Sequence, residues 1–246
     1  MRCSYGPNQR GIGACFSHAR KELIVEKPLI LPSIMCEKPW QMREYVDQFE
    51  ICGIDAIHFD VMDGHYVPNI MCGSDDFNAL RSLTDLPIDV HIMAVDPDTF
   101  IDYFELQKGD WCSFHPEVCR QPYRQLERLR GMGVRAGLAL SPAVSLDYVE
   151  NCLSVLDFVL VMAVNPGFAG QWMTPDHLDK LARLSQIVGR ADHKIDVIID
   201  GNTIPSNAKR MLAAGATGLV VGTSSLMKDG PEGFAANYER YLSDIA

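Results

Sequence analysis

Eight short apolar runs, rich in β-branched residues, recur along the chain from about Pro28 onward, and an amphipathic stretch follows most of them. A buried parallel strand has this short apolar pattern, whereas apolar residues three or four positions apart form one face of a helix. Strict alternation of the two patterns predicts a parallel sheet covered by helices. The predicted strands span residues 29–35, 56–64, 88–93, 111–117, 135–141, 158–164, 194–201 and 218–224.

Eight strand–helix units are the number that closes a barrel, and 246 residues fit the roughly 250 of one such domain. We therefore predict a single-domain α/β protein with the (β/α)8 TIM-barrel fold over residues 28–246. Residues 1–27 fall outside the pattern and are predicted to be an N-terminal extension. An open, doubly wound sheet is the alternative, but it usually has a glycine-rich turn after its first strand, and none follows residues 31–35.

The net charge of −10 disfavours nucleic acids and anionic membranes as partners, because both select for basic patches. The eight cysteines are scattered without a C-x-x-C pair, which is typical of reduced thiols in a cytoplasmic protein. The N-terminal residues contain no apolar run long enough for a signal peptide or a membrane span. We expect a cytoplasmic, soluble homo-oligomer that binds neither nucleic acid nor membrane.

Polar side chains occur near the C-terminal ends of three predicted strands, where the catalytic residues of α/β barrels lie. His58 and Asp60 are two residues apart and share one face of their strand, as Asp89 and His91 do on the next, and Asp200 lies near the end of the seventh. A buried charge is costly unless it is paired or bound to a metal. Two imidazoles and two carboxylates suit one divalent metal ion, Zn²⁺, Fe²⁺, Mn²⁺ or Co²⁺. A purely structural hydrogen-bond network is the alternative.

Two further segments follow the sixth and eighth predicted strands. The segment NPGFAGQ, residues 165–171, has two glycines that let backbone N–H groups approach an oxyanion. The segment GTS, residues 222–224, leads into the last helical pattern, and barrels often bind phosphate near their last two strands. Each segment taken alone also fits an ordinary surface turn.

Taken together, PSIM, HFDVMDGHYVPN, DVHIM, NPGFAGQ, IDG and GTS, in this order and spacing, closely resemble the ribulose-phosphate 3-epimerase family. The resemblance implies a sugar-phosphate substrate and a metal held by His58, Asp60, His91 and Asp200. It also implies that Asp60 and Asp200 are the catalytic acid/base pair, which inverts C3 through an enediolate. The substrate-binding residues that it implies are Ser33, His91, Gly167, Phe168, Ala169, Gly170, Gly201, Asn202, Gly222, Thr223 and Ser224. Met62, Met93 and Met162 resemble the methionines that surround the reacting carbon.

The family has two branches, one for ribulose 5-phosphate/xylulose 5-phosphate and one for allulose 6-phosphate/fructose 6-phosphate. PSIMC at 32–36, HPE at 115–117 and Ala169 resemble the hexose-phosphate branch, so allulose 6-phosphate is the expected substrate and ribulose 5-phosphate the alternative. Asn202 stands where the pentose branch usually has glycine. The chain departs from both branches at Ile198, where a glutamate is usual.

Two other functions fit a phosphate-binding barrel of this sequence less well. A decarboxylase or an aldolase needs a lysine at a strand end, but no predicted strand ends in lysine, and Lys194 begins one. A non-catalytic sugar-phosphate-binding barrel is expected to lack a metal ligand, whereas all four are present. The sequence therefore predicts an isomerase, an epimerase that acts on a carbohydrate phosphate.

Overall fold

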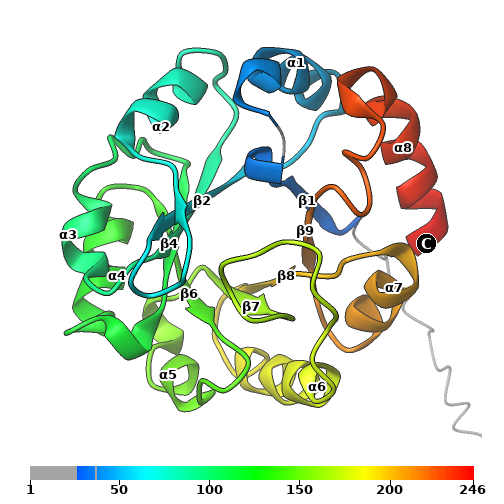
Figure 1. The fold of residues 1–246 in the computed structure, drawn as a ribbon. Helices are drawn as coiled ribbons and strands as arrows, with labels where there is room; N and C mark the ends of the chain where they lie inside the picture. The colour runs from blue at the N-terminus through cyan, green and yellow to red at the C-terminus, as the bar shows by residue number, and fades with distance from the viewer. Residues whose placement is uncertain (1–26, 37) are drawn as a thin grey trace, which may run out of the picture.

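The structure, a computed structural model, describes residues 27–36 and 38–246, and it confirms the (β/α)8 barrel (Figure 1). The predicted extension lies outside these residues except for Lys27. The barrel strands are β1 (Leu29–Pro32), β2 (Ile57–Asp63), β4 (Ile88–Met93), β5 (Trp111–Phe114), β6 (Arg135–Leu140), β7 (Phe158–Met162), β8 (Asp196–Asp200) and β9 (Gly218–Val221). The surrounding helices are α1 (Met42–Cys52), α2 (Ser74–Arg81), α3 (Pro97–Ile101), α4 (Pro122–Gly131), α5 (Asp147–Glu150), α6 (His177–Val188), α7 (Pro205–Ala213) and α8 (Gly230–Ile245).

Every predicted strand contains one barrel strand, but most observed strands end earlier than predicted. The chain leaves the hydrogen-bonded ladder soon after the polar residues at the barrel mouth, and short 3₁₀ helices follow β1 (Ile34–Cys36) and β5 (Pro116–Val118). One short strand was not predicted: β3 (Ile70–Met71) pairs antiparallel with the end of β2. Two residues are too few for an alternating pattern that identifies a strand.

The sheet closes between β1 and β2. The barrel strands follow the order β1-β9-β8-β7-β6-β5-β4-β2, and all adjacent pairs are parallel. A parallel bridge joins Ser33 to His58, and the backbone N–H of Asp55 donates to the carbonyl of Ile30 at 3.3 Å. An open, doubly wound sheet would leave its two edge strands unpaired with each other, so this alternative is wrong.

The two faces of each strand have different surroundings, as the period of two predicts. Ile57, Phe59 and Val61 of β2 pack in the core between strands and helices, whereas His58 and Asp60 point into the barrel. Below these polar groups an apolar layer fills the barrel interior, formed by Leu31, Ala56, Trp111, Ala139, Phe158, Leu160, Met162, Ile198 and Val220. Ile198 is therefore part of this apolar layer, two residues before Asp200 at the polar end of β8.

Three glycines that follow helices have left-handed backbone conformations. Gly53, which caps α1, has a φ of 60°, and Gly133 and Gly215, which follow α4 and α7, have φ values of 80° and 106°.

The six cysteines of the described residues are free thiols, as predicted, while Cys3 and Cys15 lie outside these residues. Within residues 27–36 and 38–246, no helix combines the length and apolar character that crossing a membrane requires.

Candidate active site

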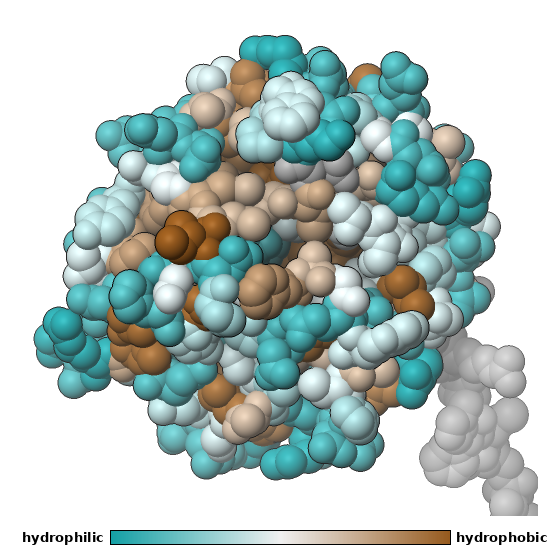
Figure 2. All heavy atoms as spheres, in the orientation of Figure 1, coloured by the Kyte–Doolittle hydropathy of each residue, from teal (hydrophilic) through white to brown (hydrophobic). Residues whose placement is uncertain are grey.

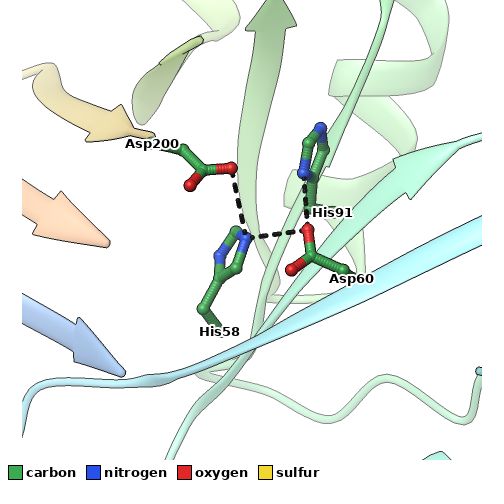
Figure 3. Close-up of side chains that lie close together, drawn as sticks. All are labelled: His58, Asp60, His91 and Asp200. Atoms are coloured by element: carbon green, nitrogen blue, oxygen red, sulfur yellow. Dashed lines mark hydrogen bonds and ion pairs between the residues drawn. The ribbon is translucent and has the colours of Figure 1, made fainter. Parts of the chain in front are cut away.

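Four side chains from three strands meet at the mouth of the barrel: His58 and Asp60 of β2, His91 of β4 and Asp200 of β8 (Figure 3). One ligand atom from each lies within 4.8 Å of the others. Nε2 of His58 is 3.2 Å from Oδ1 of Asp60 and 3.9 Å from Oδ2 of Asp200. Nδ1 of His91 is 3.1 Å from the same Asp60 oxygen. The structure thus brings together the four residues that the sequence singled out as metal ligands.

The positions of these four side chains follow from strand register. The β2–β4 pairing places Asp60 directly beside His91, so their side chains project from neighbouring strands at one level. Asp200 comes from β8, which β1 and β9 separate from β2 around the barrel. The two carboxylates therefore approach the centre of the mouth from different sides.

The carboxylates of Asp60 and Asp200 have opposite pKa shifts. Burial by itself would raise the pKa of Asp60, but the charges and hydrogen bonds of His58 and His91 outweigh burial and lower this pKa far below its usual range. Burial raises the pKa of Asp200, and the more distant charge of His58 only partly offsets it. One carboxylate is held ionised and the other is protonated more readily, which is the arrangement expected of an acid/base pair.

His58 is held in place by Asp89, which lies next to it on the barrel interior. Nδ1 of His58 donates to Oδ2 of Asp89 at 2.7 Å, and both side chains are fully buried. Burial lowers the pKa of His58, but the carboxylates of Asp60 and Asp89 more than compensate and raise it well above its usual value. Alternation along the strand correctly predicts the face that carries Asp89, but it does not indicate which side chain Asp89 contacts.

His91 has a different partner, a third histidine. Nε2 of His91 is 3.0 Å from Nε2 of His115, which follows β5 and is fully buried. Burial, and then the neighbouring His91, lower the pKa of His115 well below its usual value, so His115 is neutral. The HPE segment resembles a marker of the sugar branch, and nothing in its spacing indicates this contact with His91.

A pocket opens above the four clustered side chains. It is lined by Asp60 and Asp200 and by every predicted substrate-binding residue except His91, which is fully buried beneath it. Met62, Met93 and Met162 also line it, together with Cys36, Val164 and Thr203, which sequence analysis did not select. Oγ of Ser33 donates to Oδ2 of Asp60 at 3.0 Å, so this hydroxyl orients the carboxylate on the side facing β1.

The loop after β7, residues 165–171, lies over the barrel opening in Figure 1. Its turn requires Gly167, whose φ of 113° is unfavourable for any residue with a side chain. Nε2 of Gln171 donates to the carbonyls of Asn165 and Phe168 at 2.7 and 2.8 Å, which ties the loop to itself. Nδ2 of Asn69, in the loop after β2, donates to the carbonyl of Gly167 at 2.9 Å. The two loops are therefore joined above the pocket.

The face that carries the pocket is mostly polar, with apolar atoms among the polar ones near the opening (Figure 2). Two large apolar side chains near the joined loops are exposed: Ile70 of β3 is 80% and Phe168 of the loop after β7 is 53% accessible to solvent. Phe168 also lines the pocket, where an apolar side chain can contact a bound ligand.

Asn202, at the far side of the pocket, has a left-handed backbone conformation with a φ of 52°. Asparagine tolerates this conformation better than most residues. Nδ2 of Asn207 donates to Oδ1 of Asn202 at 2.5 Å and to its carbonyl at 3.2 Å. These bonds use the oxygens of Asn202, so its side-chain amide nitrogen is the atom that can donate to a bound substrate.

Residues 29–226 match the family described as the ribulose-phosphate 3 epimerase family. The chain belongs to this family. A ribulose-phosphate 3-epimerase of Rhodospirillum rubrum is 43% identical over 168 residues, which cover 68% of this chain and 74% of the relative. Ribulose-phosphate 3-epimerase 1 of Cupriavidus necator is 39% identical over 199 residues, which cover 79% and 83% of the two chains. The resemblance read from the motifs is confirmed, and the protein is an epimerase, an enzyme of the isomerase class.

Solved structures that resemble this epimerase support the barrel fold alone. A tryptophan synthase α-subunit of Pyrococcus furiosus superimposes with a TM-score of 0.60 at 12% sequence identity, covering 89% of this chain and 97% of that one. At this identity, the likeness extends to the arrangement of strands and helices and not to the chemistry of the site.

Proposed function

We propose that the protein is a metal-dependent ketose-phosphate 3-epimerase in which Asp60 and Asp200 serve opposite faces of C3. The observation that carries this proposal is the convergence of two imidazoles and two carboxylates on the floor of the pocket. Their nitrogen and oxygen donors suit Zn²⁺, Fe²⁺, Mn²⁺ or Co²⁺. Two carboxylates also balance the charge of one divalent ion, which explains how four such groups are accommodated above an apolar layer.

The side chains that would hold the metal are His58, Asp60, His91 and Asp200. When bound there, the metal supplies a Lewis acid that stabilises the negative charge of an enediolate. Asp89 orients His58 by accepting its Nδ1 hydrogen, so that Nε2 faces the other ligands. Such an outer partner fixes the ring and increases its basicity as a ligand.

Asp60 and Asp200 would transfer the protons at C3. Asp60 is ionised through its contacts with His58 and His91, so it can accept the C3 proton of one epimer. Asp200, with its raised pKa, can return a proton to the opposite face. Because the reaction is reversible, the two carboxylates exchange roles when the other epimer is the substrate.

The remaining residues of the pocket would orient the substrate and exclude water. Met62, Met93 and Met162 line the pocket beside the carboxylates and offer no competing hydrogen bonds. On the other side, Gly201 and the segment 222–224 present backbone near β8 and β9, the region where barrels often bind phosphate. Binding energy from a phosphate remote from C3 can hold the sugar in its reactive orientation.

The names of the relatives support ribulose 5-phosphate and xylulose 5-phosphate as the substrate pair, since they are called ribulose-phosphate 3-epimerases. Allulose 6-phosphate, the sugar expected from the sequence, is a second candidate. Asn202 favours it, because Asn202 lines the pocket and the bonds from Asn207 engage only its oxygens, so its side-chain nitrogen can donate to an added hydroxyl. The homo-oligomer, the cytoplasmic location and the absence of a nucleic-acid partner stay predictions from the sequence.

Purified protein of known metal content, assayed on both sugar phosphates, tests this function. We expect about one divalent ion per chain, loss of turnover when it is removed, and recovery when it is restored. Full activity of metal-free protein would contradict metal dependence. The ratio of kcat/KM for the two sugars decides between the two substrates without affecting the proposed chemistry.

A further inference from the structure

A hydrogen-bonded chain runs from His91 to the outside of the barrel mouth through side chains that are not part of the proposed ligand set. Nε2 of His91 is 3.0 Å from Nε2 of His115, and Nδ1 of His115 is 3.3 Å from Oγ of Ser141. Oγ of Ser141 is 2.8 Å from the hydroxyl of Tyr66, which donates to Oε1 of Glu117 at 2.7 Å.

The direction of every bond in this chain follows from its outer end. An ionised carboxylate only accepts hydrogen bonds, so the Tyr66 hydroxyl donates its hydrogen to Glu117. The Tyr66 oxygen must then accept a hydrogen bond from the Ser141 hydroxyl. Because Ser141 donates its only hydroxyl hydrogen to Tyr66, the Ser141 oxygen accepts a hydrogen bond from Nδ1–H of His115.

The same reasoning extends to His91. A neutral imidazole with a hydrogen on Nδ1 has a lone pair on Nε2, so Nε2 of His115 accepts from Nε2–H of His91. Two nitrogens 3.0 Å apart bond only when one of them carries the hydrogen and the other the lone pair. His91 therefore carries a hydrogen on Nε2, on the side away from the metal-ligand cluster, and its Nδ1 faces Asp60.

We propose that His115 is a positioning residue that accepts the Nε2 hydrogen of His91 and so leaves Nδ1 of His91 as the nitrogen that binds the metal. The inference rests on the proposed metal-dependent function and assigns a residue that keeps one ligand in its binding form. His58 and His91 are thus held by different means, the first by the carboxylate of Asp89 and the second by a neutral imidazole. A neutral partner orients His91 without adding a further negative charge that would weaken the metal as a Lewis acid.

The surroundings of His115 keep this imidazole in one orientation. The ring of Tyr66 lies against it, with ring centroids 4.5 Å apart and an angle of 33° between the planes. Ser141 is fixed by Lys180, whose Nζ donates to the carbonyls of Ser141, Pro142 and Val144 at 2.8, 3.1 and 2.8 Å. A partner held on both sides loses little conformational entropy when it orients His91.

Histidine tautomers can be measured directly in the wild-type protein by long-range ¹H–¹⁵N NMR with ¹⁵N-labelled histidine. The measurement is made on metal-free and Zn²⁺-loaded protein, so it does not depend on activity or on the folding of a variant. We expect a hydrogen on Nδ1 and none on Nε2 of His115, and a hydrogen on Nε2 of His91 in both forms. A hydrogen on Nε2 of His115 would overturn the proposal.

Two variants test the consequence for metal affinity, measured by competition with a chelator. His115→Leu removes the acceptor while keeping an apolar filling, and His115→Gln can place its amide oxygen near the position of Nε2. We expect about 10- to 100-fold weaker Zn²⁺ binding for His115→Leu, the range seen when outer partners of a ligand are removed, and at least partial recovery for His115→Gln. Thermal unfolding of the metal-free variants shows whether each is folded.

Equal Zn²⁺ affinity of His115→Leu and wild type would contradict the inference, as would an equal loss in both folded variants, which indicates packing alone. Failure of the proposed function would look different. A wild-type protein that binds no divalent ion would contradict the metal-dependent function, while the tautomers of the metal-free protein would still show whether His115 holds His91 as inferred.

Discussion

Asp89 accepts a hydrogen bond from His58 at 2.7 Å inside the barrel, where neither side chain is accessible to solvent. The second oxygen of Asp89 has no hydrogen-bond partner among the described residues. A buried carboxylate with one unpaired oxygen is unfavourable unless a nearby positive charge compensates for it. In this site a protonated His58 can supply the compensating charge, and so would a metal ion at the proposed site, so the pair would couple the fold to that site.

Asp89→Asn should weaken metal binding by about 10- to 100-fold while leaving the fold intact, because the amide oxygen still accepts from His58 but no longer carries a charge. Metal affinity of the folded variant, measured by chelator competition, checks this. Asp147→Asn, which removes an exposed carboxylate on α5, is the matched control and should bind metal as the wild type does. Unchanged affinity in Asp89→Asn would show that Asp89 has only a packing role.

Asp60→Asn and Asp200→Asn should each reduce epimerisation by about a hundredfold to ten-thousandfold, because each removes the proton acceptor or donor on one face of C3. Both carboxylates are also proposed metal ligands, so metal content has to be measured beside the rate. In a metal-loaded variant, the surviving carboxylate should still exchange the C3 proton of one epimer with deuterated solvent. Near wild-type turnover of a metal-loaded Asp200→Asn protein would show that the acid/base assignment is wrong.

Metal affinity should rise with pH. The pKa of His58 is raised well above its usual value, so near neutral pH the metal-free protein carries a proton on His58 that a metal must displace. Below this raised pKa, release of one proton makes the affinity increase about tenfold per pH unit, and the slope decreases once the pH exceeds it. Calorimetry in buffers of different ionisation enthalpy counts the protons released. Affinity independent of pH across the neutral range would contradict a protonated His58.

Asn202→Gly should lower kcat/KM for allulose 6-phosphate by about 2- to 10-fold and leave that for ribulose 5-phosphate nearly unchanged, since one neutral hydrogen bond is lost. The left-handed backbone at this position suits glycine, so the variant is expected to fold. Asn207→Ala releases the bonds that hold Asn202 and should have a smaller effect in the same direction. An equal change for both sugars would remove Asn202 as a residue that distinguishes them.

The fold and the floor of the site could be predicted because both depend on local periodicity. Alternation along β2 and β4 places His58, Asp60 and His91 on the inner faces of their strands, and parallel strands in a barrel bring their C-terminal ends together. Short-range pattern therefore determined which residues gather at the mouth, and the motifs extended the prediction to the loops that line the pocket.

Only the tertiary structure decided which atoms of those residues meet. The bonds of His115 to His91 and of Asn207 to Asn202 depend on ring and amide orientations, which packing against other strands and loops determines and no spacing encodes. The pairing of β1 with β2, which brings Ser33 to Asp60, joins segments that are 27 residues apart. Periodicity selects the face of a strand, whereas hydrogen-bond direction and pKa depend on the neighbours that the closed barrel supplies.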